Sequence, residues 1–79
     1  MPSIPINQKI SSVQFEGEFL VIQSGPETYK WKIIEISKRL SLASEAERNN
    51  FRISASGYGI HWPLIDEDLS LNGLINNRE

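Results

Sequence analysis

Two tight-turn signals divide the first part of the chain into three short segments of strand character. Gly17 can take the positive φ of a tight turn, and Ser24-Gly25-Pro26-Glu27 carries the glycine–proline signal of a loop. Around these turns we expect strands at 12–15, 19–22 and 28–33. In the third strand apolar residues alternate with lysines, which is the period of a half-buried strand. The pattern predicts an antiparallel β-meander with Trp31 on its core face.

The apolar run Phe19-Leu20-Val21-Ile22 is continuous, which indicates a strand shielded on both faces. In one interpretation another copy of the protein covers its second face. In the other, the N-terminal arm covers it. Beyond residue 33 the period changes. Ile36, Leu40 and Ala43 recur at spacings of four and three, which predicts one apolar stripe on a helix, or a broken helix, over 34–43.

Further turn and cap signals organise the rest of the chain. Ser44 and Glu47 match a capping box, which predicts a helical turn over 45–50 or a bent continuation of the preceding helix. We then expect strands at 51–55 and 60–62, because the first alternates apolar and polar residues and Pro63 stops the second. Ser70 is placed to cap a short helix over 71–75. Residues 1–8 are expected to form an N-terminal arm, and 76–79 a polar tail.

These elements predict an α+β fold in which an antiparallel β-meander packs against one or two helices, with extra short strands and a short C-terminal helix. The 79 residues are too few for two cores, so we expect a single domain over 1–79. The chain has no cysteine, which excludes disulfides and thiolate zinc sites. A homodimer is a further expectation, because small domains often gain stability by association.

Charge and hydropathy narrow the functional classes. Eight basic residues stand against ten acidic ones, for a formal net charge of −2, so no basic field attracts nucleic acid to this chain alone. No apolar run approaches the roughly 20 residues that span a membrane, and the N-terminus lacks a signal-peptide pattern. Together with the absence of cysteine, this predicts a cytoplasmic protein with no membrane partner.

The segment 57–70 concentrates the unusual residues of the chain. It contains two glycines, Tyr58, the only histidine, Trp62 and a run of acids. Here the sequence resembles the bacterial domain-of-unknown-function family 2442 (DUF2442), whose members end in a glycine, an Ile-His-Trp-Pro-like stretch, an Asp-Glu-Asp-like stretch and a Leu-Leu-like helix. The resemblance runs from about residue 10 to 75, and outside 57–70 it is carried by Trp31-Lys32, the Leu40 region, Glu47-Arg48 and Phe51-Arg52-Ile53.

The resemblance implies a small α+β fold with a meander packed on helices. Some members of that family carry a fused helix-turn-helix domain, and others are encoded beside small toxin-like proteins as candidate antitoxins. Because this chain ends soon after the motif, we expect no such appended domain here. The family supplies no catalytic residues to carry over.

His61 has two interpretations. It could act as a general acid–base group with Asp66 or Asp68. It could instead point outward from a strand beside a buried tryptophan, with its ring bound to a backbone carbonyl, and we favour this second interpretation. The acids Asp66, Glu67 and Asp68 could bind a hard cation, but they lack the ligand pattern of a calcium loop. We expect them to face solvent, with Asp68 helping to cap the last helix.

Trp62 is either a core residue or the centre of an interface, because tryptophan is common in both. Lys38, Arg39, Arg48 and Arg52 could contact phosphates, although a solvated face is the ordinary explanation for them. We predict an interaction module, antitoxin-like or regulatory, that binds a small partner protein encoded nearby and has no catalytic residues, metal or cofactor. The alternatives are a small-ligand binder or enzyme using His61, and a DNA-associated regulator acting as a dimer. The candidate interface residues are Tyr58, His61, Trp62, Asp66, Glu67 and Asp68.

Overall fold

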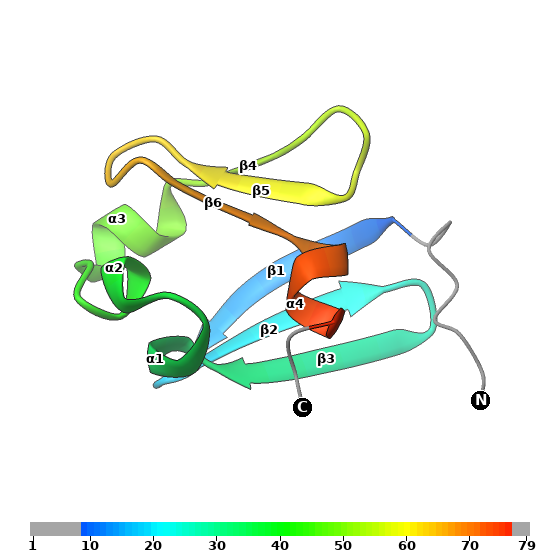
Figure 1. The fold of residues 1–79 in the computed structure, drawn as a ribbon, viewed down its shortest axis with the longest axis horizontal. Helices are drawn as coiled ribbons and strands as arrows, with labels where there is room; N and C mark the ends of the chain where they lie inside the picture. Colours follow the sequence, from blue (N-terminus) through cyan, green and yellow to red (C-terminus); the bar gives the residue numbers. More distant parts are fainter. Residues whose placement is uncertain (1–8, 77–79) are drawn as a thin grey trace.

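The computed structural model describes residues 9–76 and begins with the expected antiparallel meander (Figure 1). Its strands are β1 (Ile10–Glu16), β2 (Phe19–Ser24) and β3 (Glu27–Lys32), with β2 in the centre. Gly17 and Gly25 both take a φ of 59° in the connecting turns, as the tight-turn signals require. The expected arm at 1–8 and the end of the expected tail lie outside the described residues.

The register of this meander sheet separates two faces. Leu20 lies opposite Trp31 on one side and Phe15 on the other, and Leu20 and Trp31 are buried. The expectation of a core-facing Trp31 is therefore confirmed. On the other face Phe19 is half-buried, and the ammonium of Lys30 lies 4.7 Å from the centre of its ring. Coverage of this face by a second copy or by the arm stays a prediction.

The second half of the chain forms another antiparallel sheet, the C-terminal sheet. It consists of β4 (Arg52–Ile53), β5 (Gly59–Trp62) and β6 (Glu67–Ser70), in that order. The expected strand at 51–55 is only two residues long, because Ser54 bonds to Gly59 and the chain then turns. Strand β6 was not predicted. Its acidic residues favour a loop by composition, but pairing with β5 holds them in a strand.

Four short helices connect and close the sheets: α1 (Ile33–Ile36), α2 (Lys38–Ser41), α3 (Glu45–Asn49) and α4 (Leu71–Asn76). The helix expected over 34–43 is broken at Ser37, which is extended, with φ −162° and ψ 107°. The Ser37 hydroxyl accepts a hydrogen bond from the Leu40 amide at 3.0 Å and so starts a new helix. The capping box of Ser44 and Glu47 and the Ser70 cap are confirmed, the latter through a 3.0 Å bond from the Gly73 amide.

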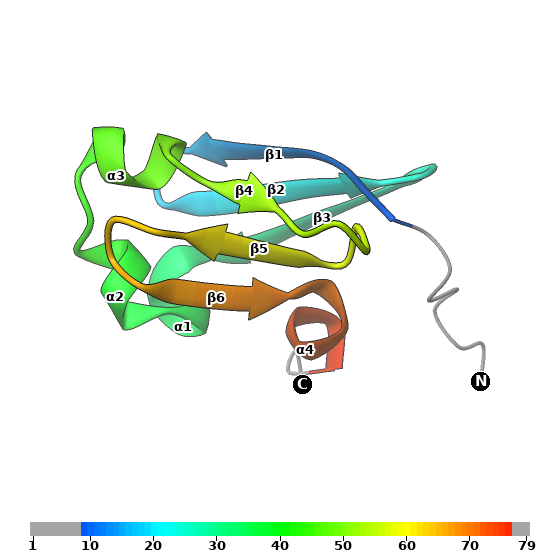
Figure 2. The ribbon, with the colours of Figure 1, turned by 90° about the horizontal axis from the view of Figure 1, so that it is seen from above.

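The two sheets lie face to face, with α1 to α3 at one end and α4 toward the other (Figures 1 and 2). The α+β class and the terminal helix are confirmed, while the packing of the meander on a second sheet was not predicted.

One shared core fills the space between the layers. Each fully buried leucine or isoleucine in it contributes about 1.5–3 kcal/mol. Its buried apolar residues are Ile10, Leu20, Ile22, Trp31, Ile33, Leu40, Ile60, Trp62, Leu71 and Leu74. Within residues 9–76 no helix has the length and apolar character to cross a bilayer.

Candidate functional site

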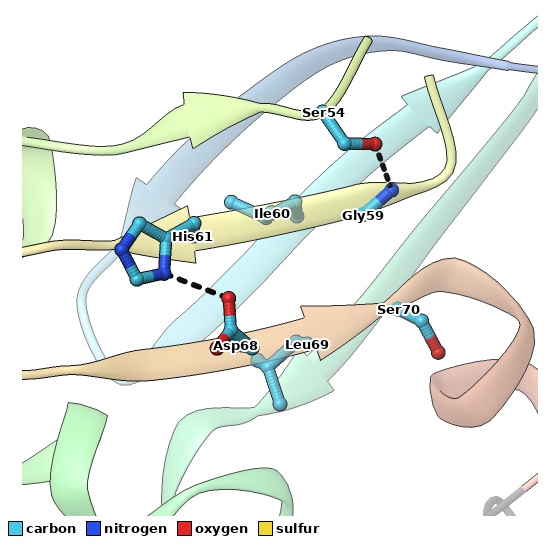
Figure 3. Close-up of a pocket in the computed structure, with 7 residues that line it drawn as sticks. All are labelled: Ser54, Gly59, Ile60, His61, Asp68, Leu69 and Ser70. Atoms are coloured by element: carbon cyan, nitrogen blue, oxygen red, sulfur yellow. Dashed lines mark hydrogen bonds and ion pairs between the residues drawn. The ribbon is translucent and has the colours of Figure 1, made fainter. Parts of the chain in front are cut away.

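The pairing of β5 with β6 places a histidine and a carboxylate side by side on the outer face of the C-terminal sheet. His61 lies opposite Asp68, and its Nδ1 is 2.7 Å from Asp68 Oδ1 (Figure 3). Because side chains alternate along a strand, the neighbouring Ile60 and Trp62 point the other way into the core. The outward orientation of His61 is confirmed, but its ring binds a carboxylate rather than the backbone carbonyl that we expected.

A shallow hollow of about 340 Å³ lies beside this pair on the outer face. Gly59, on β5, lines the hollow and has no side chain to fill it. The Gly59 amide donates to Ser54 Oγ at 3.0 Å, which ties the end of β4 to β5 (Figure 3). The lining residues come from or adjoin all three strands of the sheet: Ser54, Gly59, Ile60, His61, Asp68, Leu69 and Ser70.

The structure separates the other predicted interface residues. Trp62 has no exposed surface, so the interface interpretation of this side chain is wrong. Its ring packs against Phe15 and Phe51, with centroid distances of 6.3 and 6.2 Å, because the strand alternation turns it inward. Glu67, on β6, also points to the inner side of the C-terminal sheet, and its carboxylate accepts a hydrogen bond from the Ser37 hydroxyl.

Asp66 lies in the turn before β6, with a φ of 53°, and does not pair with His61. Its main-chain carbonyl accepts a 2.7 Å hydrogen bond from Arg39 Nη1. Tyr58 is half-buried in the turn before β5, and its carbonyl accepts from the Leu71 amide at 2.8 Å. Asp68 was expected to help cap α4. It lies instead in the middle of β6, and the capping atom is Ser70 Oγ.

Of the predicted set, His61 and Asp68 are joined by a side-chain hydrogen bond on the outer face, while Trp62 and Glu67 lie opposite each other on the inner side of the same strand pair. Sequence analysis missed Ser54 and Gly59 as lining residues, since neither is near the acidic run in the chain. The register of β4 on β5 pairs Ile53 with Ile60, which brings the serine after Ile53 to the glycine before Ile60. The sequence indicates that Ser54 and Gly59 are neighbours only if β4 and β5 are first aligned as a hairpin with a short turn.

Few reactive side chains lie near the His61–Asp68 pair. A carboxylate bound to Nδ1 orients the imidazole and leaves Nε2 as its second nitrogen for a ligand or proton transfer. The two nearby hydroxyls each accept a hydrogen bond from a main-chain amide, Ser54 Oγ from Gly59 and Ser70 Oγ from Gly73. Across the described part of the chain, no three His, Asp or Glu side chains gather closely enough to hold a metal ion.

The basic residues considered for phosphate contact have separate positions. Arg48 donates to the main-chain carbonyls of Leu40, Ser41 and Gly17, with nitrogen–oxygen distances of 3.1, 3.0 and 3.5 Å. Arg52 lies on β4 opposite His61. Arg48 therefore has a clear role in joining α2 to the β1–β2 turn.

Comparison with known proteins gives a family and a fold. The family model described as "Protein of unknown function (DUF2442)" matches residues 10–79. Among solved structures, the chain is similar to a protein of unknown function from Rhodospirillum rubrum ATCC 11170, with a TM-score of 0.74 and 24% identity, over 87% of this chain and 86% of that one. None of the curated proteins compared with the chain matches it.

Proposed function

Because the chain belongs to the DUF2442 family, we propose that it is a cytoplasmic protein-interaction module, antitoxin-like or regulatory, that binds a small partner protein encoded beside it. The observation that carries the proposal is the open hollow on the outer face of the C-terminal sheet, bordered by a fixed His61–Asp68 pair. A sheet face presents its side chains in a fixed register, which suits recognition of a folded partner.

Exposure of the pair supports docking at this face. The side chains of His61 and Asp68 are 44% and 75% exposed, so a partner can reach both. Their mutual hydrogen bond limits the rotamers of both side chains before a partner arrives. Such pre-organisation lowers the entropy cost of binding.

The partner that fits this face is a basic one. Asp68 presents an exposed carboxylate at the wall of the hollow, and Asp66 lies nearby in the preceding turn. A lysine or arginine of the partner can enter above Gly59 and pair with Asp68, because the glycine leaves room for a long side chain. Complementary charge of this kind raises the association rate.

Co-expression of the tagged chain with the neighbouring gene tests the proposal. Capture followed by size-exclusion chromatography with light scattering should give a stoichiometric complex with a small basic protein. Asp68→Asn keeps the shape of the side chain, removes its charge and should weaken the complex about tenfold. Glu27→Gln, an exposed acid at the start of β3, is the matched control and should leave the affinity unchanged. Recovery of the chain without a partner would contradict the proposal.

The His61–Asp68 pair also favours a second candidate, a small-ligand binder or enzyme in which His61 acts as the acid–base group and Asp68 orients it. A fragment screen followed by NMR would detect ligand binding at this site as changes in amide chemical shift confined to the residues that line the hollow. Loss of the binding in His61→Ala, with the other amide signals unchanged, would support this candidate. Fragments that bind elsewhere on the chain, or bind His61→Ala equally well, would rule it out.

A further inference from the structure

We propose that Asn72, in the first turn of α4, is a site of spontaneous deamidation to aspartate and isoaspartate, and that the Ser70 cap of this helix controls the rate. Asn72 is followed by Gly73, and it is the only asparagine of the chain with a glycine after it. Both residues are exposed. The reaction needs no partner protein, so the inference is independent of the proposed function.

The reactants are the chain itself and water. The main-chain nitrogen of Gly73 attacks the side-chain carbonyl carbon, Cγ, of Asn72. The bond from Cγ to the side-chain amide nitrogen breaks, and that nitrogen leaves as ammonia with the proton of the Gly73 amide. Water then opens the cyclic succinimide at one of its two carbonyls, which gives either aspartate or isoaspartate. A glycine in the second position favours ring closure, because no Cβ crowds the attacking nitrogen.

The nitrogen that attacks is the one that Ser70 holds. The Gly73 amide donates to Ser70 Oγ at 3.0 Å, where β6 passes into α4 (Figure 3). This bond keeps the main chain helical, a conformation in which the nitrogen is not aligned with Cγ for ring closure. The cap also accounts for the glycine, because a Cβ added at Gly73 would lie 2.9 Å from Ser70 Oγ. The arrangement that caps α4 therefore uses the residue that makes Asn72 reactive.

Ring closure takes place when the first turn of α4 opens. A helix of six residues is marginal by itself, and local opening costs less free energy than global unfolding. The helix is held by Leu71 and Leu74, which are 5% and 4% exposed, and by a 2.8 Å bond from the Leu71 amide to the Tyr58 carbonyl. Loss of the Ser70 cap should raise the open population, and with it the deamidation rate, roughly fivefold.

Isoaspartate at position 72 changes the main chain as well as the charge. It adds a carbon atom to the main chain between Leu71 and Leu74, so the two buried leucines lose their helical spacing. Ser70 also lines the hollow on the outer face of the C-terminal sheet. Conversion of Asn72 therefore loosens α4 and alters one edge of that hollow.

Incubation of the natural chain at neutral pH, followed by peptide mapping with mass spectrometry, tests the inference. The peptide that contains Asn72 should acquire the mass of the carboxylic acid, and enzymatic methylation should identify isoaspartate in it. The peptide that contains Asn49 and Asn50, which no glycine follows, should stay unchanged over the same time. Conversion of Asn72 no faster than that of Asn49 and Asn50 would overturn the proposal.

Two cap variants test the control by Ser70. Ser70→Ala should deamidate about fivefold faster than the natural chain. Ser44→Ala is the matched control, because it removes a cap of the same kind from α3, and it should leave the rate at Asn72 unchanged. Asn72→Gln should abolish the conversion, because ring closure from the longer side chain is much slower. Equal rates in Ser70→Ala and Ser44→Ala would contradict control by the Ser70 cap.

A measurement on the natural chain alone gives the same information without a variant. In concentrated urea the cap is lost, so Asn72 should convert faster in the unfolded chain than in the folded one. Equal rates in the two states would show that the fold does not protect Asn72, and this would also overturn the proposal.

Discussion

The indole Nε1 of Trp62 donates a hydrogen bond to the main-chain carbonyl of Arg48, at 2.9 Å. Trp62 is the largest fully buried side chain of the described structure, and this bond gives its one polar atom a partner inside the core. The guanidinium of Arg48 in turn binds carbonyls of α2 and of the β1–β2 turn. The two residues therefore connect β5 to α3, to α2 and to the meander sheet.

Replacing Trp62 should lower stability rather than remove a binding contact. Trp62→Phe leaves the Arg48 carbonyl without its buried donor and opens space beside Phe15 and Phe51. The expected loss is about 2 kcal/mol or more in the free energy of unfolding, and Trp62→Ala should lose about 3–5 kcal/mol. Urea denaturation followed by circular dichroism measures both.

His61→Ala, the neighbour on the outer face, should change the free energy of unfolding by less than about 1 kcal/mol. Similar losses in the free energy of unfolding at positions 61 and 62 would argue against an outward-facing His61 beside an inward-facing Trp62.

Arg48→Lys should destabilise the fold although it keeps the charge. The planar guanidinium reaches three carbonyls on two elements, whereas a lysine ammonium cannot serve them in the same geometry. We expect a loss of about 1–2 kcal/mol in the free energy of unfolding. Arg52→Lys is the control, because Arg52 is exposed on β4, and it should cost less than about 0.5 kcal/mol. Thermal or urea denaturation compares the two, and equal effects would contradict the joining role of Arg48.

The meander was predictable because its signals are local. Gly17 and Gly25 mark the turns by their conformational freedom, and the alternation around Trp31 marks the buried face within one strand. The break at Ser37 was only an alternative within the prediction. Its cause is partly distant in sequence, because the Ser37 hydroxyl, besides capping α2, also binds the carboxylate of Glu67 on β6.

The candidate site depends on contacts that no local pattern encodes. His61 and Asp68 were both singled out, yet Asp66 was an equal candidate for the histidine until the β5–β6 register was known. Strand β6 itself escaped prediction, because the run Asp66-Glu67-Asp68 is typical of a loop or helix start. Once β6 pairs with β5, alternation alone assigns Asp68 to the outer face and Glu67 to the Ser37 side.

The capping box at the start of α3 should contribute measurably to stability. Ser44 Oγ accepts from the Glu47 amide at 3.2 Å, and Glu47 Oε1 accepts from the Ser44 amide at 2.8 Å. Ser44→Ala removes the first bond and should cost about 1 kcal/mol in the free energy of unfolding, whereas Ser44→Gly should cost only a few tenths. Urea denaturation of the two variants gives the comparison. If Ser44→Gly were the more damaging change, backbone freedom rather than the cap would control this helix start.

Two neighbouring glycines should respond differently to alanine. Gly57 has a φ of +88°, and an added Cβ would lie 2.8 Å from Lys9 Cδ and 2.9 Å from Lys9 Cβ. Gly57→Ala should therefore cost about 1–3 kcal/mol in the free energy of unfolding. At Gly59 the nearest atom to an added Cβ would be Ser54 Oγ at 3.3 Å, and the φ is not in the left-handed region. Gly59→Ala should cost less than about 1 kcal/mol.

The same pair of variants separates stability from recognition. Gly59→Ala places a methyl group on the floor of the hollow, so it should weaken binding of the proposed basic partner while the fold remains intact. Gly57 does not line the hollow. The folded fraction of Gly57→Ala should therefore bind with unchanged affinity. Urea denaturation and titration with the captured partner measure the two effects. Weaker binding by Gly57→Ala alone would move the docking surface from the hollow to the turn between β4 and β5.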